Sequence, residues 1–278
     1  MRVTWEELGW ERLSDRAGRV RLPEWDCTVG LVATPGAALL IDAGSSLPEG
    51  TRLRTEAALL TGVNVTHLAL THPHFDHVLG APAFPDAKTY AATREYDAAS
   101  LATDAVHHGL PPHLAEEATA ALTTPDHVVR DRLTLVLGGA ADDTVEPGVR
   151  EGTGVTAAAG ADVSEHPAAR PARASSAPEA PVEILLARLG PAHSPDDLVV
   201  LVPGTPPVLF CGDLVEESGE PQAGPDSVPG RWPDVLDALL ELGGEDALYV
   251  PGHGAVVDAE FVRRQRDALR ERFGVSRA

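Results

Sequence analysis

The sequence feature that most limits the fold is a dense run of ionisable side chains directly after a short apolar segment. Residues 66–70 have the apolar character of a short strand, and the chain continues Thr-His72-Pro-His74-Phe-Asp76-His77. Three imidazoles and a carboxylate offer the nitrogen and oxygen ligands that suit zinc, iron or manganese. Residues i and i+2 of an extended segment share a face, so we expect His72 and His74 on one side and Asp76 and His77 at a neighbouring point. This spacing favours two adjacent metal ions over one.

Three further candidate ligands follow apolar segments and are flanked by glycine or proline. His193 lies in Gly-Pro-Ala-His-Ser, Asp213 follows Val-Leu-Phe-Cys-Gly, and His253 lies in Pro-Gly-His-Gly. Taken alone, each has an ordinary explanation as a surface, turn or core residue. Because loops at one end of a sheet can converge, the first cluster together with these three positions predicts one common site.

The rest of the chain alternates short apolar runs with helical patterns, which predicts a mixed α/β fold. We expect a hairpin over 27–42 and helices over 51–61, 93–104, 113–122, 232–242 and 259–272. Further strands are expected at 66–70, 88–91, 133–137, 182–189, 197–202, 207–211 and 247–250.

One segment, residues 139–181, differs from the rest in composition. It is dominated by Ala, Gly, Pro, Ser and acidic residues and contains no aromatic residue, Leu, Ile or Met. Such a segment cannot bury enough apolar surface to offset its ordering entropy, so we predict a disordered insertion. The length of 278 residues then corresponds to a single domain over 1–278 that carries this insertion.

Charge and composition exclude several classes of protein. The 42 acidic and 22 basic residues give a formal net charge of −20, which opposes binding to nucleic acids and to anionic membranes. No apolar run reaches the roughly 18 residues of a membrane span. Residues 1–12 contain three glutamates and no apolar core of a signal peptide, and the two cysteines cannot form a disulfide framework. We therefore expect a cytoplasmic protein with a small-molecule substrate.

The set His72-x-His74-x-Asp76-His77, followed by His193, Asp213 and His253, resembles the metallo-β-lactamase superfamily. The resemblance runs from about residue 27 to 273 apart from the insertion. It implies a four-layer αββα sandwich with a dinuclear site at the edge of its two sheets.

Carried over residue by residue, the resemblance implies a role for each ligand. His72, His74 and His193 would hold the first metal ion, while Asp76, His77 and His253 would hold the second and Asp213 would bridge both. The resemblance also implies that Asp42, in Ile-Asp-Ala-Gly, supports the metal loop. Ser194, next to a ligand, is expected to form a hydrogen bond within its loop.

The ligand set predicts hydrolytic chemistry. Two divalent ions, zinc being the first expectation and iron or manganese the alternatives, share a hydroxide that is nucleophilic at neutral pH. No serine or cysteine nucleophile is then required, and Asp76 is the candidate that orients the hydroxide and passes a proton to the leaving group. We expect a hydrolase of small esters, thioesters or lactones, similar in its ligand set to glyoxalase II.

Comparison with subfamilies leaves two alternatives. A persulfide dioxygenase would use one iron held by fewer of these residues, and a quorum-signal lactonase would carry a tyrosine at position 216, where this chain has Glu216. The resemblance argues against a lactam-cleaving enzyme, because those enzymes generally lack a carboxylate at the position of Asp213 and are exported.

Overall fold

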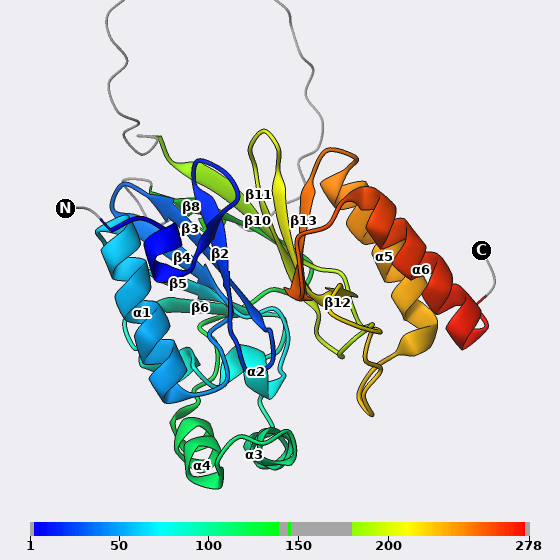
Figure 1. The fold of residues 1–278 in the computed structure, drawn as a ribbon, viewed down its shortest axis with the longest axis horizontal. Coiled ribbons are helices and arrows are strands. Elements are labelled where there is room, and N and C mark those ends of the chain that lie inside the picture. The colour runs from blue at the N-terminus through cyan, green and yellow to red at the C-terminus, as the bar shows by residue number, and fades with distance from the viewer. Residues whose placement is uncertain (1–2, 139–143, 146–179, 276–278) are drawn as a thin grey trace, which may run out of the picture.

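Two β-sheets and the helices outside them form four layers in the computed structural model of the chain (Figure 1). The structure describes residues 3–138, 144–145 and 180–275. The predicted disordered insertion at 139–181 therefore lies outside the described residues, apart from 144–145 and 180–181. Among the described residues, no helix combines the length and the apolar character needed to cross a bilayer.

The first sheet has seven strands that follow one another in chain order. They are β1 (Glu11–Arg12), β2 (Ala17–Arg21), β3 (Thr28–Thr34), β4 (Ala37–Ile41), β5 (His67–Ala69), β6 (Lys88–Ala91) and β7 (His127–Val128). The strands from β1 to β4 pair antiparallel, and those from β4 to β7 pair parallel. The parallel strands therefore present their carboxyl ends at one edge of the sheet.

The second sheet, within the described residues, has the order β13-β12-β11-β10-β8-β9. Its strands are β8 (Arg132–Leu137), β9 (Thr144–Val145), β10 (Val182–Arg188), β11 (Leu198–Val202), β12 (Val208–Glu216) and β13 (Leu248–His253). β12 and β13 pair parallel, with irregular register after Phe210. Such an irregularity re-aims the side chains that follow it, and Asp213 is one of these.

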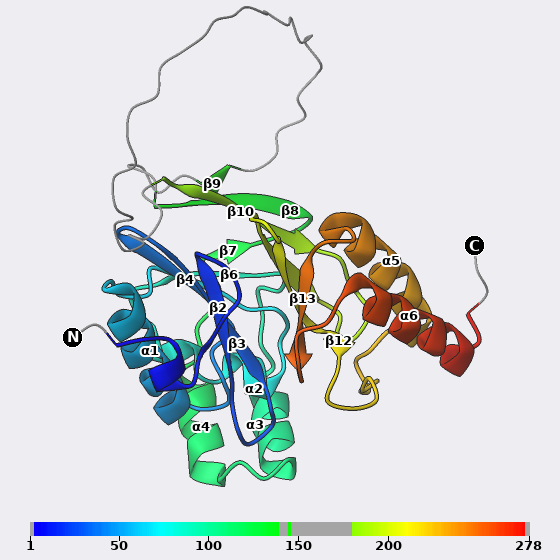
Figure 2. The same cartoon turned by 45° about the horizontal axis from the view of Figure 1, so that its top comes forward.

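The α-helices are α1 (Leu47–Thr61), α2 (Phe75–Val78), α3 (Ala98–His107), α4 (Pro112–Ala121), α5 (Trp232–Gly243) and α6 (Ala259–Phe273). Helix α1 flanks the first sheet and helices α5 and α6 flank the second, while α2, α3 and α4 lie at the lower end of the view (Figures 1 and 2). Three short 3-10 helices complete the described elements, namely η1 (Glu6–Leu8), η2 (Ala81–Ala83) and η3 (Pro229–Arg231).

Alternation along the strands explains why the layers stack in this order. In β4, Leu39 and Ile41 pack against the other sheet, while Leu40 packs toward the helices. In β12, Phe210 faces the first sheet and Leu209 faces the layer of α5 and α6. Because successive side chains of a strand point to opposite faces, strands this apolar must be covered on both sides. The predicted αββα sandwich is confirmed.

Local signals account for most element boundaries. The predicted helix at 51–61 begins earlier, at Leu47, because the Ser46 side chain accepts a hydrogen bond from the Glu49 N–H and Pro48 suits the first turn. The sequence patterns missed β1, β2, β7, β9 and α2, and β9 lies inside the segment predicted to be disordered. Four of these have only two to four residues, and β2 (Ala-Gly-Arg-Val-Arg) mixes glycine and arginine into the run.

Candidate metal centre

All seven predicted ligands come together at one end of the two sheets. β5 ends at Ala69, so His72 and His74 lie in the following loop, whereas Asp76 and His77 lie on α2. The expected shared strand face is therefore replaced by a loop and a short helix. The other three ligands are on β12, at the end of β13 and in the loop between β10 and β11, namely Asp213, His253 and His193.

The first ligand group consists of His72, His74 and His193 together with Asp213. The three imidazole centroids are 4.6–4.8 Å apart, and His74 Nδ1 lies 3.0 Å from His193 Nε2. Asp213 Oδ2 lies 3.4 Å from His193 Nε2 and 3.7 Å from His72 Nε2. One atom from each of the four side chains lies within 4.8 Å of the others, a spacing that could hold a metal ion.

The second ligand group consists of Asp76, His77 and His253, again with Asp213. His77 Nε2 lies 3.2 Å from Asp213 Oδ1, and His253 Nε2 lies 3.3 Å from Asp213 Oδ2. Asp76 Oδ2 lies 3.3 Å from His253 Nε2 and 3.6 Å from His77 Nε2. Asp213 therefore has carboxylate oxygens close to histidines of both groups.

Four of the histidines use their outer nitrogen for a hydrogen bond to a fixed oxygen. The pairs are His77 Nδ1 with Asp42 Oδ2 (2.9 Å), His253 Nδ1 with Trp25 O (2.7 Å), His193 Nδ1 with Gln222 O (3.1 Å) and His74 Nε2 with Asp226 Oδ2 (3.1 Å). Carbonyl and carboxylate oxygens only accept, so the outer nitrogen carries the proton. In the neutral ring, the lone pair is then on the inner nitrogen, as a metal ligand requires.

Asp42 anchors the loop that carries the first histidines. Its Oδ1 accepts the Thr71 N–H (2.8 Å) and its Oδ2 accepts the Thr71 hydroxyl (2.8 Å). Because the Thr71 proton is used in this way, its hydroxyl oxygen is free to accept from His72 Nδ1, 3.0 Å away. Asp42 thus holds His77 directly and His72 through Thr71, which gives a physical basis for the support expected of it.

Gly252 allows the Asp213 carboxylate to reach the centre. A Cβ at position 252 would lie 1.9 Å from Asp213 Oδ1, closer than any real contact of this type. The Pro-Gly-His-Gly sequence therefore has a steric reason: the residue before His253 must be glycine for the carboxylate to pass over the chain.

The electrostatics of the centre keep two histidines neutral. Burial lowers the pKa of His193 to about 4 and that of His72 well below its usual value. Burial also disfavours a charge on His253, but Asp213 and Asp76 outweigh it and raise the pKa of His253 to about 12. The buried carboxylates thus require a nearby positive charge, which a divalent cation can supply.

Two buried polar atoms without hydrogen-bond partners indicate that the site fits a metal ion. His72 Nε2 and Asp213 Oδ1 are inaccessible to solvent and make no hydrogen bond within the described residues. Buried polar atoms without partners are rare in proteins, and both atoms lie on the inner side of the ligand groups. Together with a donor set of imidazole nitrogens and carboxylate oxygens, they fit a divalent transition metal.

Several residues that hold the site were missed by sequence reasoning. Trp25, Gln222 and Asp226 lie in loops without a motif, and two of them act through a backbone carbonyl that no sequence pattern reveals. Cys27 also lies beside the centre: its Sγ is 3.7 Å from His77 Nδ1 and donates to Asp76 O.

The remaining predicted residue, Ser194, forms its hydrogen bond inside the His193 loop. Its hydroxyl donates to Asp197 Oδ1 at 2.7 Å, and its N–H donates to the same atom at 3.0 Å. Asp197 also accepts the Ala192 N–H at 2.9 Å. Asp197 therefore fixes the backbone on both sides of His193.

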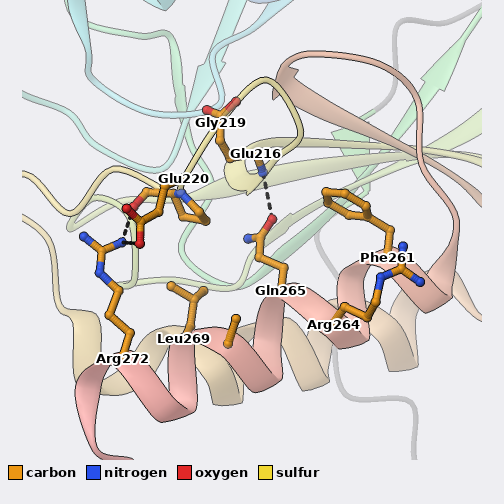
Figure 3. Close-up of a pocket in the computed structure, with 10 residues that line it drawn as sticks. Glu216, Gly219, Glu220, Phe261, Arg264, Gln265, Leu269 and Arg272 are labelled. Atoms are coloured by element: carbon orange, nitrogen blue, oxygen red, sulfur yellow. Dashed lines mark hydrogen bonds and ion pairs between the residues drawn. The ribbon is translucent and has the colours of Figure 1, made fainter.

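A cavity of about 300 Å³ lies outside the metal centre, between α6 and the segment that leaves β12 (Figure 3). None of the seven ligands lines it, although Glu216 at its wall is three residues from Asp213. In Figure 3 the Gln265 side chain reaches from α6 to the backbone of Glu216. This cavity is therefore distinct from the candidate metal centre.

Comparison with known proteins agrees with this architecture. The family model described as "Metallo-beta-lactamase superfamily" matches residues 22–253, a range that includes all seven ligands. No curated protein matches the chain significantly. Similar solved structures include the metallo-β-lactamase FIM-1 from Pseudomonas aeruginosa in its mono-zinc form, with a TM-score of 0.58, 16% identity and coverage of 96% of each chain. At this identity the likeness shows the fold alone. The chain belongs to the metallo-β-lactamase superfamily.

Proposed function

We propose that this protein is a dinuclear metal-dependent hydrolase acting on a small ester, thioester or lactone. The observation that carries the proposal is the convergence of the inner atoms of the ligand side chains, while outer nitrogens of their histidines are fixed by acceptors. In this proposal His72, His74 and His193 hold one cation, Asp76, His77 and His253 hold the other, and Asp213 contacts both. Zinc suits this donor set best, with iron and manganese as alternatives.

The roles of the protein groups follow from their positions. When bound, the two cations would polarise the substrate carbonyl oxygen and lower the pKa of water towards neutrality. Asp76 performs the proton transfer. Burial alone would raise its pKa, but His77 and His253 lower it, so the Asp76 carboxylate is ionised at neutral pH. We propose that this carboxylate accepts the proton of the attacking water and returns it to the leaving group.

The formal charge of −20 supports a small substrate over a nucleic acid. Neither Ser194 nor Cys27, the hydroxyl and thiol groups beside the centre, is suited to act as a nucleophile, which supports attack by water. Ser194 is engaged by Asp197, and burial raises the pKa of Cys27 to about 11.

Metal quantification on the purified full chain, followed by a panel of an ester, a thioester, a lactone and a phosphodiester, tests the proposal. We expect two zinc ions per chain and turnover of at least one carbonyl substrate, lost on chelation and restored by zinc. One iron per chain with oxygen uptake would instead identify a persulfide dioxygenase-like oxidoreductase. Failure to bind any metal would overturn the proposal.

A further inference from the structure

The first ligand group depends on one loop, residues 217–228, for the orientation of two of its histidines. Gln222 O accepts from His193 Nδ1 and Asp226 Oδ2 accepts from His74 Nε2, each at 3.1 Å. The end of the loop is fixed to the His193 loop, because the Val228 N–H donates to Ala192 O at 2.8 Å. The 217–228 loop is therefore attached to two histidines of the first ligand group and to the backbone beside one of them.

The second ligand group takes its hydrogen-bond acceptors from other parts of the molecule. His77 bonds to Asp42, whose side chain is only 3% exposed, and His253 bonds to the backbone carbonyl of Trp25. Both acceptors belong to the first sheet and its loops. The start of the loop also contacts the second group, because the Glu217 N–H donates to His253 O at 3.1 Å. A change confined to Asp226 leaves this contact and both acceptors of the second group in place.

Asp226 is the side-chain acceptor of this loop, and its contact determines which nitrogen of His74 faces the centre. A carboxylate oxygen at Nε2 keeps the proton on that nitrogen and leaves the lone pair on Nδ1. Nδ1 is the atom that lies 3.0 Å from His193 Nε2, inside the first ligand group. A carboxylate in this position also raises the basicity of the imidazole toward a cation.

We propose that Asp226 is a positioning residue that orients His74 and thereby sets the affinity of the first ligand group for its cation. This inference rests on the proposed metal centre. The side chain of Asp226 is 39% exposed and that of His74 is 24% exposed, so the pair stands at the solvent edge of the site. Asp226 is therefore accessible to substitution without disturbing the core.

The test compares zinc titrations of the full chain against a chromophoric chelator for four proteins: the wild type, Asp226→Asn, Asp226→Ala and Glu220→Gln. Asn keeps an acceptor without charge, whereas Ala removes both. Glu220 lies in the same loop but contacts Arg272 at 3.6 Å rather than a histidine, which makes it the matched control. A His72→Ala variant identifies the binding step that belongs to the first ligand group.

We expect Asp226→Ala to weaken that step by about 10- to 100-fold, with Asp226→Asn between Ala and the wild type and Glu220→Gln unchanged. The other step should stay the same in all four proteins. With cobalt as the probe, the visible absorption of the first position should shift in Asp226→Ala, because one ligand has lost its fixed orientation.

Unchanged zinc affinity and cobalt spectrum in Asp226→Ala would overturn the inference, and so would equal weakening of both steps. These outcomes leave the proposed hydrolase standing, because the wild type would still bind two ions. A wild type that binds no metal would instead remove the proposed function itself.

Discussion

Each histidine of the candidate centre must present one chosen nitrogen to the inside. A free imidazole exchanges its proton between two nitrogens, and only an external acceptor selects one of them. The acceptors here are two carboxylates, Asp42 and Asp226, two backbone carbonyls, and the Thr71 hydroxyl. The ligand side chains determine which donor atoms are offered to a metal ion. The acceptors determine whether each imidazole presents its lone pair to that ion.

Asp76 is the residue whose substitution separates binding from turnover. We expect Asp76→Asn to lower kcat by about 10²- to 10⁴-fold, the usual contribution of a general acid or base, because the amide cannot take up a proton at that position. At least one metal ion should stay bound, since His72, His74, His193 and Asp213 are unchanged. Steady-state kinetics and metal analysis on the same sample measure both quantities.

Asp196→Asn is the control for this experiment. Asp196 lies near His193 in sequence, but its carboxylate pairs with Arg188 at 2.9 Å and is outside both ligand groups. Turnover should match the wild type in this variant. Full activity in Asp76→Asn would rule out the proton-transfer role of Asp76.

At the scale of secondary-structure elements, helices stabilise the end of strand β12, where regular strand pairing stops. β12 departs from regular register after Phe210, and the backbone around Asp213 is instead held by side chains. Gln265 on α6 accepts the Glu216 N–H at 3.0 Å, the contact drawn in Figure 3, and donates to Leu214 O at 2.8 Å, so one amide fixes two points of the strand. Trp232 also donates to Leu214 O, at 3.0 Å. Helices α5 and α6 therefore fix the backbone of the strand that carries Asp213.

Replacing Gln265 with Met should cost about 1–3 kcal/mol of unfolding free energy. Met fills a similar volume but leaves the buried Glu216 N–H without its acceptor. Urea denaturation measures the change, and Arg264→Met is the matched control, because the neighbouring Arg264 side chain is 62% exposed and its loss should change stability by no more than about 0.5 kcal/mol. Equal stability of the two variants would contradict the role assigned to Gln265.

At the scale of the whole molecule, the candidate centre joins the two sheets. His72, His74, Asp76 and His77 follow strand β5 of the first sheet, whereas His193, Asp213 and His253 come from the second. Arg19 of β2 makes a further link, donating to Gly254 O at 2.8 Å just after His253. Cations bound here would contact both sheets at once and would stabilise the folded chain over the unfolded one.

Zinc should therefore raise the melting temperature of chelator-treated protein. At a free concentration of about 100 times Kd, one bound ion adds about 2.7 kcal/mol, which corresponds to about 5–10 °C for a chain of this size. Differential scanning calorimetry measures the shift. Calcium, which prefers oxygen ligands, is the control and should cause little change. An equal shift with both ions would contradict a site built mainly from imidazoles.

The sequence by itself determined the alternation of strands and helices and the identity of the candidate ligands. Those signals are local: apolar periodicity marks buried faces, and the run from His72 to His77 places four donors within six residues. The short elements β1, β7 and α2 were not predicted, because two to four residues are too few to show a hydrophobic period.

Only the tertiary structure decided how the ligands are oriented. His74 and Asp226 are 152 residues apart, and His253 and Trp25 are 228 residues apart, yet each pair forms one hydrogen bond. A backbone carbonyl can accept from any neighbour, so nothing in the residue type at position 25 or 222 reveals such a contact. The packing of the two sheets brings these groups together, and that packing depends on the whole core rather than on any one motif.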